Sequence, residues 1–383
     1  MRSKLSILLI LFLFIGRGFT QDAEPESQNL AYISAGMSLQ MVRLQRQDVP
    51  INQFSFPITL VFPVGHHIQM VITHTPAISS WADTANIRIS GLSDTWVQGT
   101  YVFWDEKAFL NLGIGIPTGK SNLNDREFLL SQLLDDNISG FRLPAYSQGL
   151  CRKAGVAVAL PIGESAIIGV GGEYVNHQAF VPVRYVYEVQ GEERVSEEEY
   201  KAGDEVSVNI GLDLRLKEDM KLMMDGVYTH YSPDLLSGQE IFGSGSKLVL
   251  DVGYLYQFSK QYFLGRVRYR QKGKNEIWQG LAMEEELKNS HGSETEIDLI
   301  LKALQVENGA FFFYGDGRFY GANESGIGRA TVYGGGFGVK YELSDMTDMN
   351  FQLKFLSGNR IFENNDIRDI VIFEMFLGWN FKL

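Results

Sequence analysis

Apolar and polar residues alternate in this sequence with a period of two, in segment after segment from residue 31 onward. In Ser207–Leu216 aliphatic residues occupy every second position, and polar residues or glycine fill the positions between them. The same alternation recurs in 333–343 and 349–355. Successive side chains of a strand point to opposite faces, so each segment predicts a strand with one apolar and one polar face.

The connections between these segments alternate in length. The predicted strands are roughly 31–43, 52–63, 67–77, 94–104, 108–117, 147–160, 165–178, 204–216, 219–231, 245–258, 261–272, 294–305, 310–320, 329–343, 347–358 and 368–383. Short connections lie at Val64–His66, Asp105–Lys107, Ile162–Glu164, Lys217–Glu218, Ser259–Lys260, Glu307–Asn308 and Ser344–Asp345. Long connections lie near 44–51, 78–92, 118–145, 179–203, 232–244, 273–293, 321–328 and 359–367. Short turns at one end and long loops at the other are typical of outer-membrane barrels.

The sequence therefore predicts an all-β fold, a single closed antiparallel transmembrane β-barrel of about sixteen strands. Fourteen is the alternative count, because the first strand pair and 67–77 alternate least clearly. A soluble sandwich would show similar alternation, but here the polar face carries full charges in one segment after another. The high content of Gly (40), Tyr (17) and Phe (25), with only 10 Pro, fits many short strands.

The first twenty residues have the features of a secretory signal peptide. Arg2 and Lys4 precede an apolar core of eleven residues, Leu5–Ile15, which is too short to span a bilayer. We expect a signal peptide at 1–20, a short disordered lead-in at 21–30 and the barrel at 31–383. The single cysteine, Cys151, excludes an intrachain disulfide. The net charge of −12 argues against a nucleic-acid partner.

The last predicted strand has aromatic or apolar residues at alternate positions up to its end. Phe373, Trp379, Phe381 and Leu383 lie on one face, which resembles the terminal signal that directs barrels to the barrel-assembly machinery. Further aromatic residues near strand ends are expected in the interfacial girdles: Trp96, Trp104, Tyr254, Tyr256, Phe258 and Tyr262.

Two glycine-containing motifs suggest a family resemblance. Gly91–Trp96 (Gly-Leu-Ser-Asp-Thr-Trp) leads into one strand, and Leu112–Lys120 (Leu-Gly-Ile-Gly-Ile-Pro-Thr-Gly-Lys) ends another. Together they resemble barrels grouped with the meta-pathway phenol-degradation proteins and, more distantly, FadL-type transporters of hydrophobic solutes. The resemblance implies an outer-membrane channel or transporter. The plug segment expected of FadL-type proteins has no counterpart here, because the strand pattern begins at residue 31.

Charged residues on the polar faces are candidates to line the lumen. Arg266, Arg268 and Arg270 share one face of a strand, and a short turn would place Asp251 opposite the first two. Glu296 and Asp298 lie on the inward face of the next strand, and Asp213 and Arg215 belong to the polar face of 207–216. Two interpretations stay open: a structural salt-bridge ladder, or a basic wall that orders water and selects anionic or polar solutes.

The longest loop, 118–145, contains a predicted helix at 124–136. Asn124 is positioned to cap it, and Phe128, Leu129, Leu133 and Leu134 form an apolar stripe. General sixteen-strand porins fold the loop at this place inward, and the resemblance suggests the same here. Packing of the helix over the outer rim is an equal alternative. The residues expected to constrict the pore are Asp125, Glu127, Phe128, Asp135 and Asp136.

Little in the sequence indicates enzymatic chemistry. His230 and Ser232 would share a strand face, as in membrane acyl hydrolases, but a lone His-x-Ser pair is common by chance. The histidines are scattered, so we expect no metal site and no cofactor. Acidic clusters at 188–205 and 284–286 read as solvated loops near a lipopolysaccharide surface.

Three functions therefore remain open, and we expect a protein that is not an enzyme. The first is an outer-membrane channel of a Gram-negative bacterium for small solutes, with a charged lumen. The second is a FadL-like hydrophobic-solute transporter, and the third is a non-channel barrel, either a lipid hydrolase or a structural surface protein. Outer-membrane lipids and lipopolysaccharide, the barrel-assembly machinery and a small-molecule solute are the expected partners.

Overall fold

The computed structural model describes residues 31–44, 50–81, 86–189, 192–280, 282–362 and 366–383. The predicted signal peptide and lead-in lie outside the described residues. The strands that build the wall are β1 (Tyr32–Leu44), β2 (Ile51–Ser55), β3 (Ile58–Val64), β4 (Ile68–His74), β5 (Ala77–Trp81), β6 (Ile87–Gly91), β7 (Thr95–Phe103), β8 (Ala108–Ile116), β9 (Cys151–Ile162), β10 (Ala166–His177), β14 (Glu205–Lys217), β15 (Met220–Tyr231), β18 (Lys247–Phe258), β19 (Gln261–Lys272), β22 (Glu294–Val306), β23 (Gly309–Tyr320), β24 (Ala330–Ser344), β25 (Thr347–Ile361) and β26 (Ile367–Lys382).

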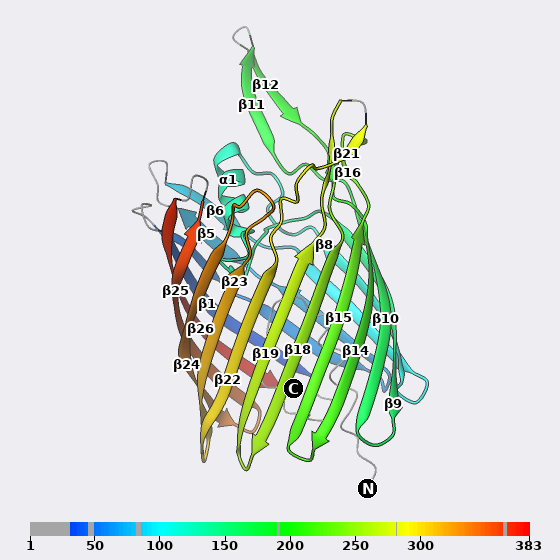
Figure 1. The fold of residues 1–383 in the computed structure, drawn as a ribbon, viewed down its shortest axis with the longest axis vertical. Helices are drawn as coiled ribbons and strands as arrows, with labels where there is room; N and C mark the ends of the chain where they lie inside the picture. Colours follow the sequence, from blue (N-terminus) through cyan, green and yellow to red (C-terminus); the bar gives the residue numbers. More distant parts are fainter. Residues whose placement is uncertain (1–30, 45–49, 82–85, 190–191, 281, 363–365) are drawn as a thin grey trace.

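These strands form one antiparallel sheet that closes on itself (Figure 1). The closing pair is β1 with β26, in register from Tyr32 opposite Lys382 to Leu44 opposite Ile370. Three wall strands are interrupted, as β2 with β3, β4 with β5 and β6 with β7, so the nineteen segments make sixteen barrel strands. The predicted barrel of sixteen strands and its seven short turns are confirmed. Closure leaves no exposed sheet edge, which is what a lipid environment requires.

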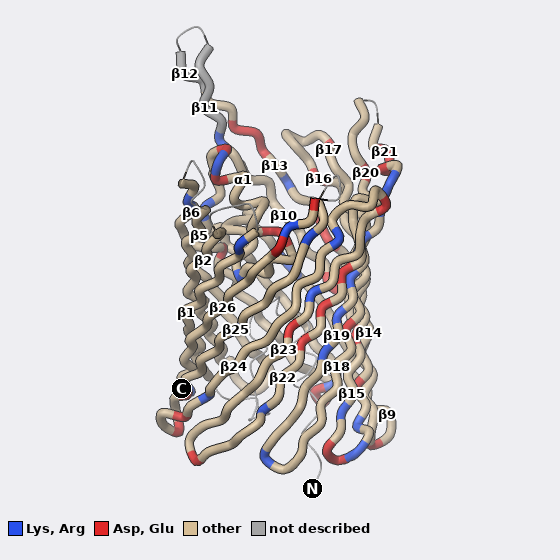
Figure 2. Tube along the Cα trace, turned by 60° about the vertical axis from the view of Figure 1, so that its left-hand side comes forward, with Lys and Arg blue, Asp and Glu red and all other residues tan. Residues whose placement is uncertain are grey.

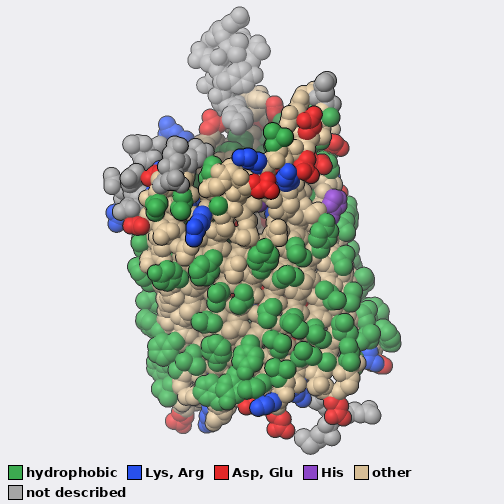
Figure 3. Space-filling view, in the orientation of Figure 1, with side chains coloured by type: hydrophobic (Ala, Val, Ile, Leu, Met, Phe, Trp, Pro, Cys, Tyr) green, Lys and Arg blue, Asp and Glu red, His purple; other side chains and the backbone are tan. Residues whose placement is uncertain are grey.

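The outer surface of the wall is apolar. On β18, Leu250 and Val252 are exposed, whereas Asp251 between them is only 8% exposed. On the face of the barrel seen in Figure 3, apolar side chains are spread over the middle part and charged residues gather at the two ends. Figure 2 nevertheless marks Lys, Arg, Asp and Glu at mid-height along β14 to β23, and those on the inward face are largely buried, among them Asp251, Arg270 and Asp316. This division is that of a transmembrane β-barrel.

Two members of the expected aromatic girdles were wrongly assigned. Trp96 lies on the inward face of β7, where the ammonium group of Lys153 is 5.8 Å from its ring. Tyr262 packs inward against the buried Phe312, with ring centroids 6.4 Å apart. Alternation fixes which residues share a face, but the aromatic character of one residue does not say which face it is.

Four of the long connections, predicted as loops, contain strands. We call the end of the barrel that carries these connections the loop end. The elements there are α1 (Asp125–Leu134), β11 (Arg184–Val189), β12 (Glu192–Glu197), β13 (Tyr200–Lys201), β16 (Asp234–Leu236), β17 (Gln239–Gly243), β20 (Glu276–Trp278) and β21 (Met283–Glu285). The predicted loop 78–92 is wrong, because β5 and β6 continue the wall beyond a break. The other strands form a projecting hairpin, β11–β12, and a separate five-stranded sheet (Figure 1).

The break conceals β5 and β6 in the sequence. Pro76 cannot donate to a ladder, and Leu92–Asp94 lies outside the sheet, so the regular pattern is interrupted in both wall strands. Ala77 and Ile89 are nevertheless buried on the inward face.

Within the described residues, no helix is long and apolar enough to cross a membrane.

Candidate functional site: the inner loop and the charged wall

The connection between β8 and β9, residues 117–150, is called the inner loop here. Both of its ends are held by Asp94, which lies in the break between β6 and β7. The Asp94 carboxylate accepts hydrogen bonds from the backbone N–H groups of Gly119 (3.1 Å) and Gln148 (2.8 Å). Its own N–H donates to the carbonyl oxygen of Tyr146. A Cβ on Gly119 would clash with that carbonyl, so only glycine fits there. The two sequence motifs thus meet at the entrance of the loop.

The predicted helix is present as α1. A capping box fixes its start, because the Asn124 side chain accepts from the N–H of Glu127 and the Glu127 carboxylate accepts from the N–H of Asn124. The buried stripe consists of Leu130 and Leu134, with Leu133 partly buried against them. Leu129, predicted in the stripe, is 46% exposed, so that assignment was wrong by one position along the helix.

The five residues expected to constrict the pore have different environments. Asp125 and Asp135, at the two ends of α1, are exposed, and Phe128 is half-buried. Glu127 forms an ion pair with Lys120, which begins the loop. Asp136 forms an ion pair with Arg360 of β25 and therefore ties the loop to the wall.

After the helix, the chain runs along the inward face of the barrel. Gln40 of β1 donates from Nε2 to the carbonyl oxygen of Gly140 (2.9 Å) and accepts from the N–H of Arg142 (2.6 Å). Gln53 of β2 does the same for Leu143, donating to its carbonyl at 2.8 Å and accepting from its N–H at 2.9 Å. Gln53 thus satisfies both backbone polar groups of Leu143, and Gln40 satisfies one group of Gly140 and one of Arg142, in a segment that has left water.

The first residues of this segment are bound to strands that lie far from β1 and β2 in the sequence. Arg318 of β23 donates to the carbonyl oxygen of Ile138 (3.1 Å). Asn137 donates to Glu294 of β22 (3.1 Å). The segment 137–143 therefore runs inside the barrel along the wall, from β22 at its first residue to β2 at its last.

Arg142 fixes the middle of the segment. Its guanidinium lies 4.4 Å from the ring centre of Phe376 on β26, within the range of a cation–π contact. Burial lowers the pKa of Arg142, and the nearby Glu374 carboxylate opposes that shift. The loop and the wall share one buried apolar cluster: Val42, Ile51, Ala77, Ile87, Ile89, Leu130, Leu134, Ile138, Phe141, Leu143, Tyr146, Ala330, Val332, Leu356, Ile370 and Ile372. The sequence left inward and outer-rim packing open, and the structure places the loop inside.

The charged wall begins with the ladder expected from the sequence. Arg266 and Arg268 of β19 both donate to the carboxylate of Asp251 on β18, at 2.7 and 2.9 Å. The short turn between β18 and β19 sets this register, with Asp251 opposite Arg268. Two guanidinium groups sharing one carboxylate leave donors that can turn toward a solute or water.

Arg270 is more completely paired. It contacts Glu294 at 2.9 Å and Glu296 at 2.6 Å and is buried. Glu294 also accepts from Asn137, so this pair supports the inner loop as well as the wall. Asp298 lies opposite Arg266 on one side and Asp316 on the other.

The remaining candidates lie nearer the end with the short turns. Asp213 of β14 pairs with Lys221 of β15 at 3.0 Å. Arg215 is exposed, two residues before the end of β14. They extend the inward charged face, but among the described residues no ion pair joins them to Arg266 or its partners.

Sequence reasoning missed a second charged group inside the barrel. Arg318 pairs with Glu374 of β26 at 3.0 Å and with Asp316 at 3.3 Å, and Lys354 of β25 reaches Asp316 at 3.4 Å. The inward phase of each strand was visible in the sequence. The pairing across β23, β25 and β26 depends on barrel closure, which the sequence does not give residue by residue.

The hydrolase alternative finds no support at His230 and Ser232. His230 is exposed and contacts Ser246 at 3.3 Å, whereas Ser232 accepts from the N–H of Asp204 at 2.7 Å. Among the described residues, no group of three or more His, Cys, Asp and Glu is arranged to hold a metal ion.

A pocket of about 200 Å³ lies at the break in the wall. Trp96 of β7, Asp94 in the break and the inner-loop residues Leu143, Pro144 and Tyr146 contribute to its lining. It is therefore bounded partly by the barrel strands and partly by the loop inside them.

Comparisons with known proteins concern the fold alone. No protein-family model and no curated protein matches the chain. Among solved structures, a high-pH structure of Pseudomonas putida OprB has 9% identity and a TM-score of 0.49, covering 92% of this chain and 94% of that one. A bacterial polysaccharide outer membrane secretin has 10% identity and a TM-score of 0.46, covering 94% and 100%. A mutant of the monoaromatic hydrocarbon channel TodX has 7% identity and a TM-score of 0.45, covering 93% and 91%.

Proposed function

We propose that this outer-membrane barrel is a channel for small polar solutes, which pass between the inner loop and the charged wall. The observation that carries the proposal is the anchored position of residues 137–143 inside the barrel, bound to β22 and β23 at the first residues and to β1 and β2 at the last. An inner loop anchored to the wall narrows the lumen of the barrel, and no plug domain is needed for this. The charged inward face of β14 to β23 then forms the rest of the path.

The wall suits polar solutes because its charges are fixed in pairs. A solute that leaves bulk water needs replacement hydrogen bonds, which rings of fixed charges supply in pores. Arg266 and Arg268 share the Asp251 carboxylate, and Arg268 also lies 3.6 Å from Glu296; their remaining donors can bind a passing anionic or polar group. Arg270 is buried between Glu294 and Glu296 and contributes mainly to the structure.

Solute flux tests the proposal directly. Purified protein would be reconstituted into liposomes, and swelling would be followed with a neutral pentose, a small amino acid and a small dicarboxylate. Swelling faster than that of protein-free liposomes is expected for all three solutes. Rates equal to those of protein-free liposomes would contradict a channel for polar solutes.

The location and partners follow from the apolar outer face. Lipids of the outer membrane contact the exposed aliphatic residues of β14 and β18, among them Val208 and Val252. We propose that Phe373, Trp379, Phe381 and Leu383 contact the barrel-assembly machinery during insertion, since they share the outward face of the strand that closes the barrel. We propose lipopolysaccharide as the neighbour of the acidic loop end.

A second candidate function is transport of a small apolar solute. The pocket at the break in the wall favours it, because Trp96, Leu143 and Pro144 contribute apolar surface to its lining. Quenching of tryptophan fluorescence by a small aromatic hydrocarbon, lost in Trp96→Phe, would support this function. Equal quenching in the variant and the wild type would argue against it.

A further inference from the structure

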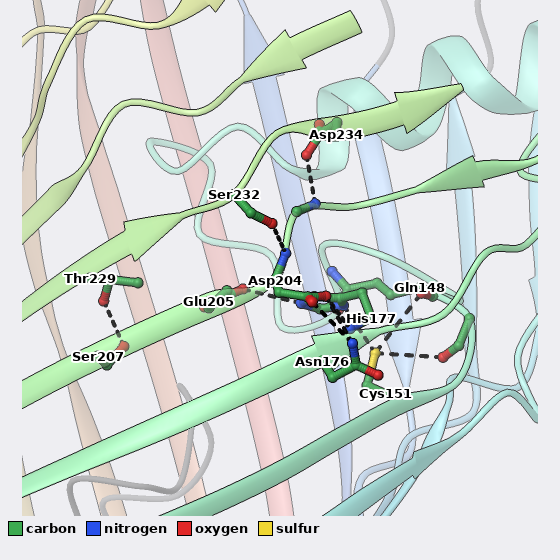
Figure 4. A network of polar contacts seen from close by, with 12 residues as sticks. Gln148, Cys151, Asn176, His177, Asp204, Glu205, Ser207, Thr229, Ser232 and Asp234 are labelled. Atoms are coloured by element: carbon green, nitrogen blue, oxygen red, sulfur yellow. Dashed lines mark hydrogen bonds and ion pairs between the residues drawn. The ribbon is translucent and has the colours of Figure 1, made fainter. Parts of the chain in front are cut away.

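A thiol, an imidazole and a carboxylate meet inside the loop end of the barrel, where β9, β10 and β14 are neighbours (Figure 4). Cys151 begins β9 and lies opposite His177, which ends β10. The sulfur of Cys151 is 3.2 Å from Nδ1 of His177. On the far side of the ring, Nε2 of His177 is 3.4 Å from Oε1 of Glu205. The order is carboxylate, imidazole and nucleophile, as in activated cysteine sites.

We propose that Cys151 is an activated thiol and a site of oxidation by small peroxides, with His177 as the base and Glu205 as the group that orients it. This inference does not depend on the solute path. A buried thiol in apolar surroundings is inert, whereas a thiol beside a charged imidazole is ionised more readily and becomes nucleophilic. Contact of the ring with the Glu205 carboxylate favours the charged imidazole.

The framework around the imidazole is rigid. Asp204 accepts hydrogen bonds from the backbone N–H of His177 (3.1 Å), the Asn176 amide (3.1 and 3.0 Å) and the Tyr174 hydroxyl (2.8 Å). Burial acts to raise the pKa of Asp204, but these hydrogen bonds lower it to about 2, so the carboxylate stays charged. The strand end that carries His177 is therefore held in place, and the ring faces the sulfur in a fixed orientation.

The reaction needs only the thiol of Cys151, the imidazole of His177 and the peroxide. The thiolate sulfur attacks one peroxide oxygen, so an S–O bond forms while the O–O bond breaks. The leaving hydroxide takes the proton that the imidazole had received from the thiol, which gives a sulfenic acid and water. Sulfur is oxidised by two electrons and the peroxide is reduced. Because Cys151 is the only cysteine, the sulfenic acid has no intrachain thiol with which to form a disulfide.

The burial of the thiol favours a small reagent. Cys151 is 1% and His177 7% exposed, whereas the side chain of Glu205 is 35% exposed and connects the group to water. The thiol also lies within donating distance of the carbonyl oxygens of Gly149 (3.6 Å) and Gln148 (3.9 Å), and Gln148 itself is exposed. This burial of the sulfur excludes a bulky maleimide more strongly than hydrogen peroxide.

The experiment measures oxidation of the full-length folded barrel in detergent micelles. Hydrogen peroxide is the probe, dimedone traps the sulfenic acid, and mass spectrometry gives the rate at pH 6 and pH 8. Wild type should react at both pH values. His177→Asn should react at least about tenfold more slowly at pH 6, because the thiolate then lacks its charged partner. The oxidation rate of Glu205→Gln should lie between that of wild type and that of His177→Asn.

His230→Asn is the matched control, since His230 also lies near the end of a barrel strand but contacts Ser246 instead of the thiol. Heat-modifiable migration on gels verifies that each variant is folded. Folded His177→Asn with the wild-type rate would overturn the proposal. So would a wild type that forms no sulfenic acid while a folded Cys151→Ser, Gln148→Cys variant does.

Discussion

Replacing Gln53 by methionine should release the inner loop without disturbing the wall. Gln53 is fully buried and binds both backbone polar groups of Leu143, with a further contact of 3.1 Å from its Nε2 to Ser79. Methionine has a similar volume but bonds to neither group. The N–H and C=O of Leu143 would then be buried without partners.

The size of the effect follows from that loss. A buried polar group without a partner costs about 1–3 kcal/mol, so two groups cost roughly 2–6 kcal/mol. Water entering the site would relieve part of this free-energy cost, so the docked loop would be destabilised by about 2–4 kcal/mol. Since 1.4 kcal/mol corresponds to a factor of ten, the equilibrium between the docked and released loop should shift about 30-fold to 1,000-fold toward release.

Limited proteolysis of the reconstituted protein measures this shift, because a released loop is cleaved and a docked one is protected. Gln98→Met is the matched control, since Gln98 is another inward glutamine, on β7, and its side chain makes no hydrogen bond to the described inner loop. We expect faster cleavage between residues 124 and 146 in Gln53→Met only. Equal cleavage of the two variants would refute the anchoring role of Gln53.

Three further predictions concern the path, the orientation and the stability of the barrel. Changing Arg266 and Arg268 to Glu should leave the barrel folded and shift ion selectivity toward cations, more so at low salt, and unchanged selectivity would make both arginines structural partners only. In a background without the native cysteine, a cysteine at Glu198 should label from outside intact cells and one at Lys217 should not, whereas the reverse would contradict the orientation. Asp204 has its pKa lowered from 3.8 to about 2, so its stabilising effect is present above pH 4 and is lost as the pH falls toward 2. Asp204→Asn should therefore melt below wild type at pH 7, with a difference that shrinks by pH 2, and a difference that persists at pH 2 would contradict this.

Much of the wall could be predicted because apolar and polar residues alternate within each strand, which shows in the sequence which residues share a face. Even the contact of Asp251 with Arg266 and Arg268 followed from one short turn, which fixes the register of neighbouring strands. The helix α1 was predictable for a similar local reason, since Asn124 and Glu127 cap it from within the same turn.

The position of the inner loop could not be predicted, because its anchors are ordinary in the sequence. Gln40 and Gln53 are polar residues on polar strand faces, and nothing local distinguishes them from Gln98. Their role arises only when a segment about a hundred positions away lies against them, as in the contact of Gln40 with Gly140. The contact between Cys151 and His177 escaped for the same reason, since it depends on the pairing of β9 with β10.

Single-channel conductance in a planar bilayer tests the central claim most directly, by comparing wild type with a variant that lacks residues 124–143 of the inner loop. Wild type should give small, discrete conductance steps, and the truncated barrel should give larger ones, because the loop narrows the path from inside. Equal conductance in the two proteins, or no conductance in a folded wild type, would contradict a channel narrowed by its inner loop.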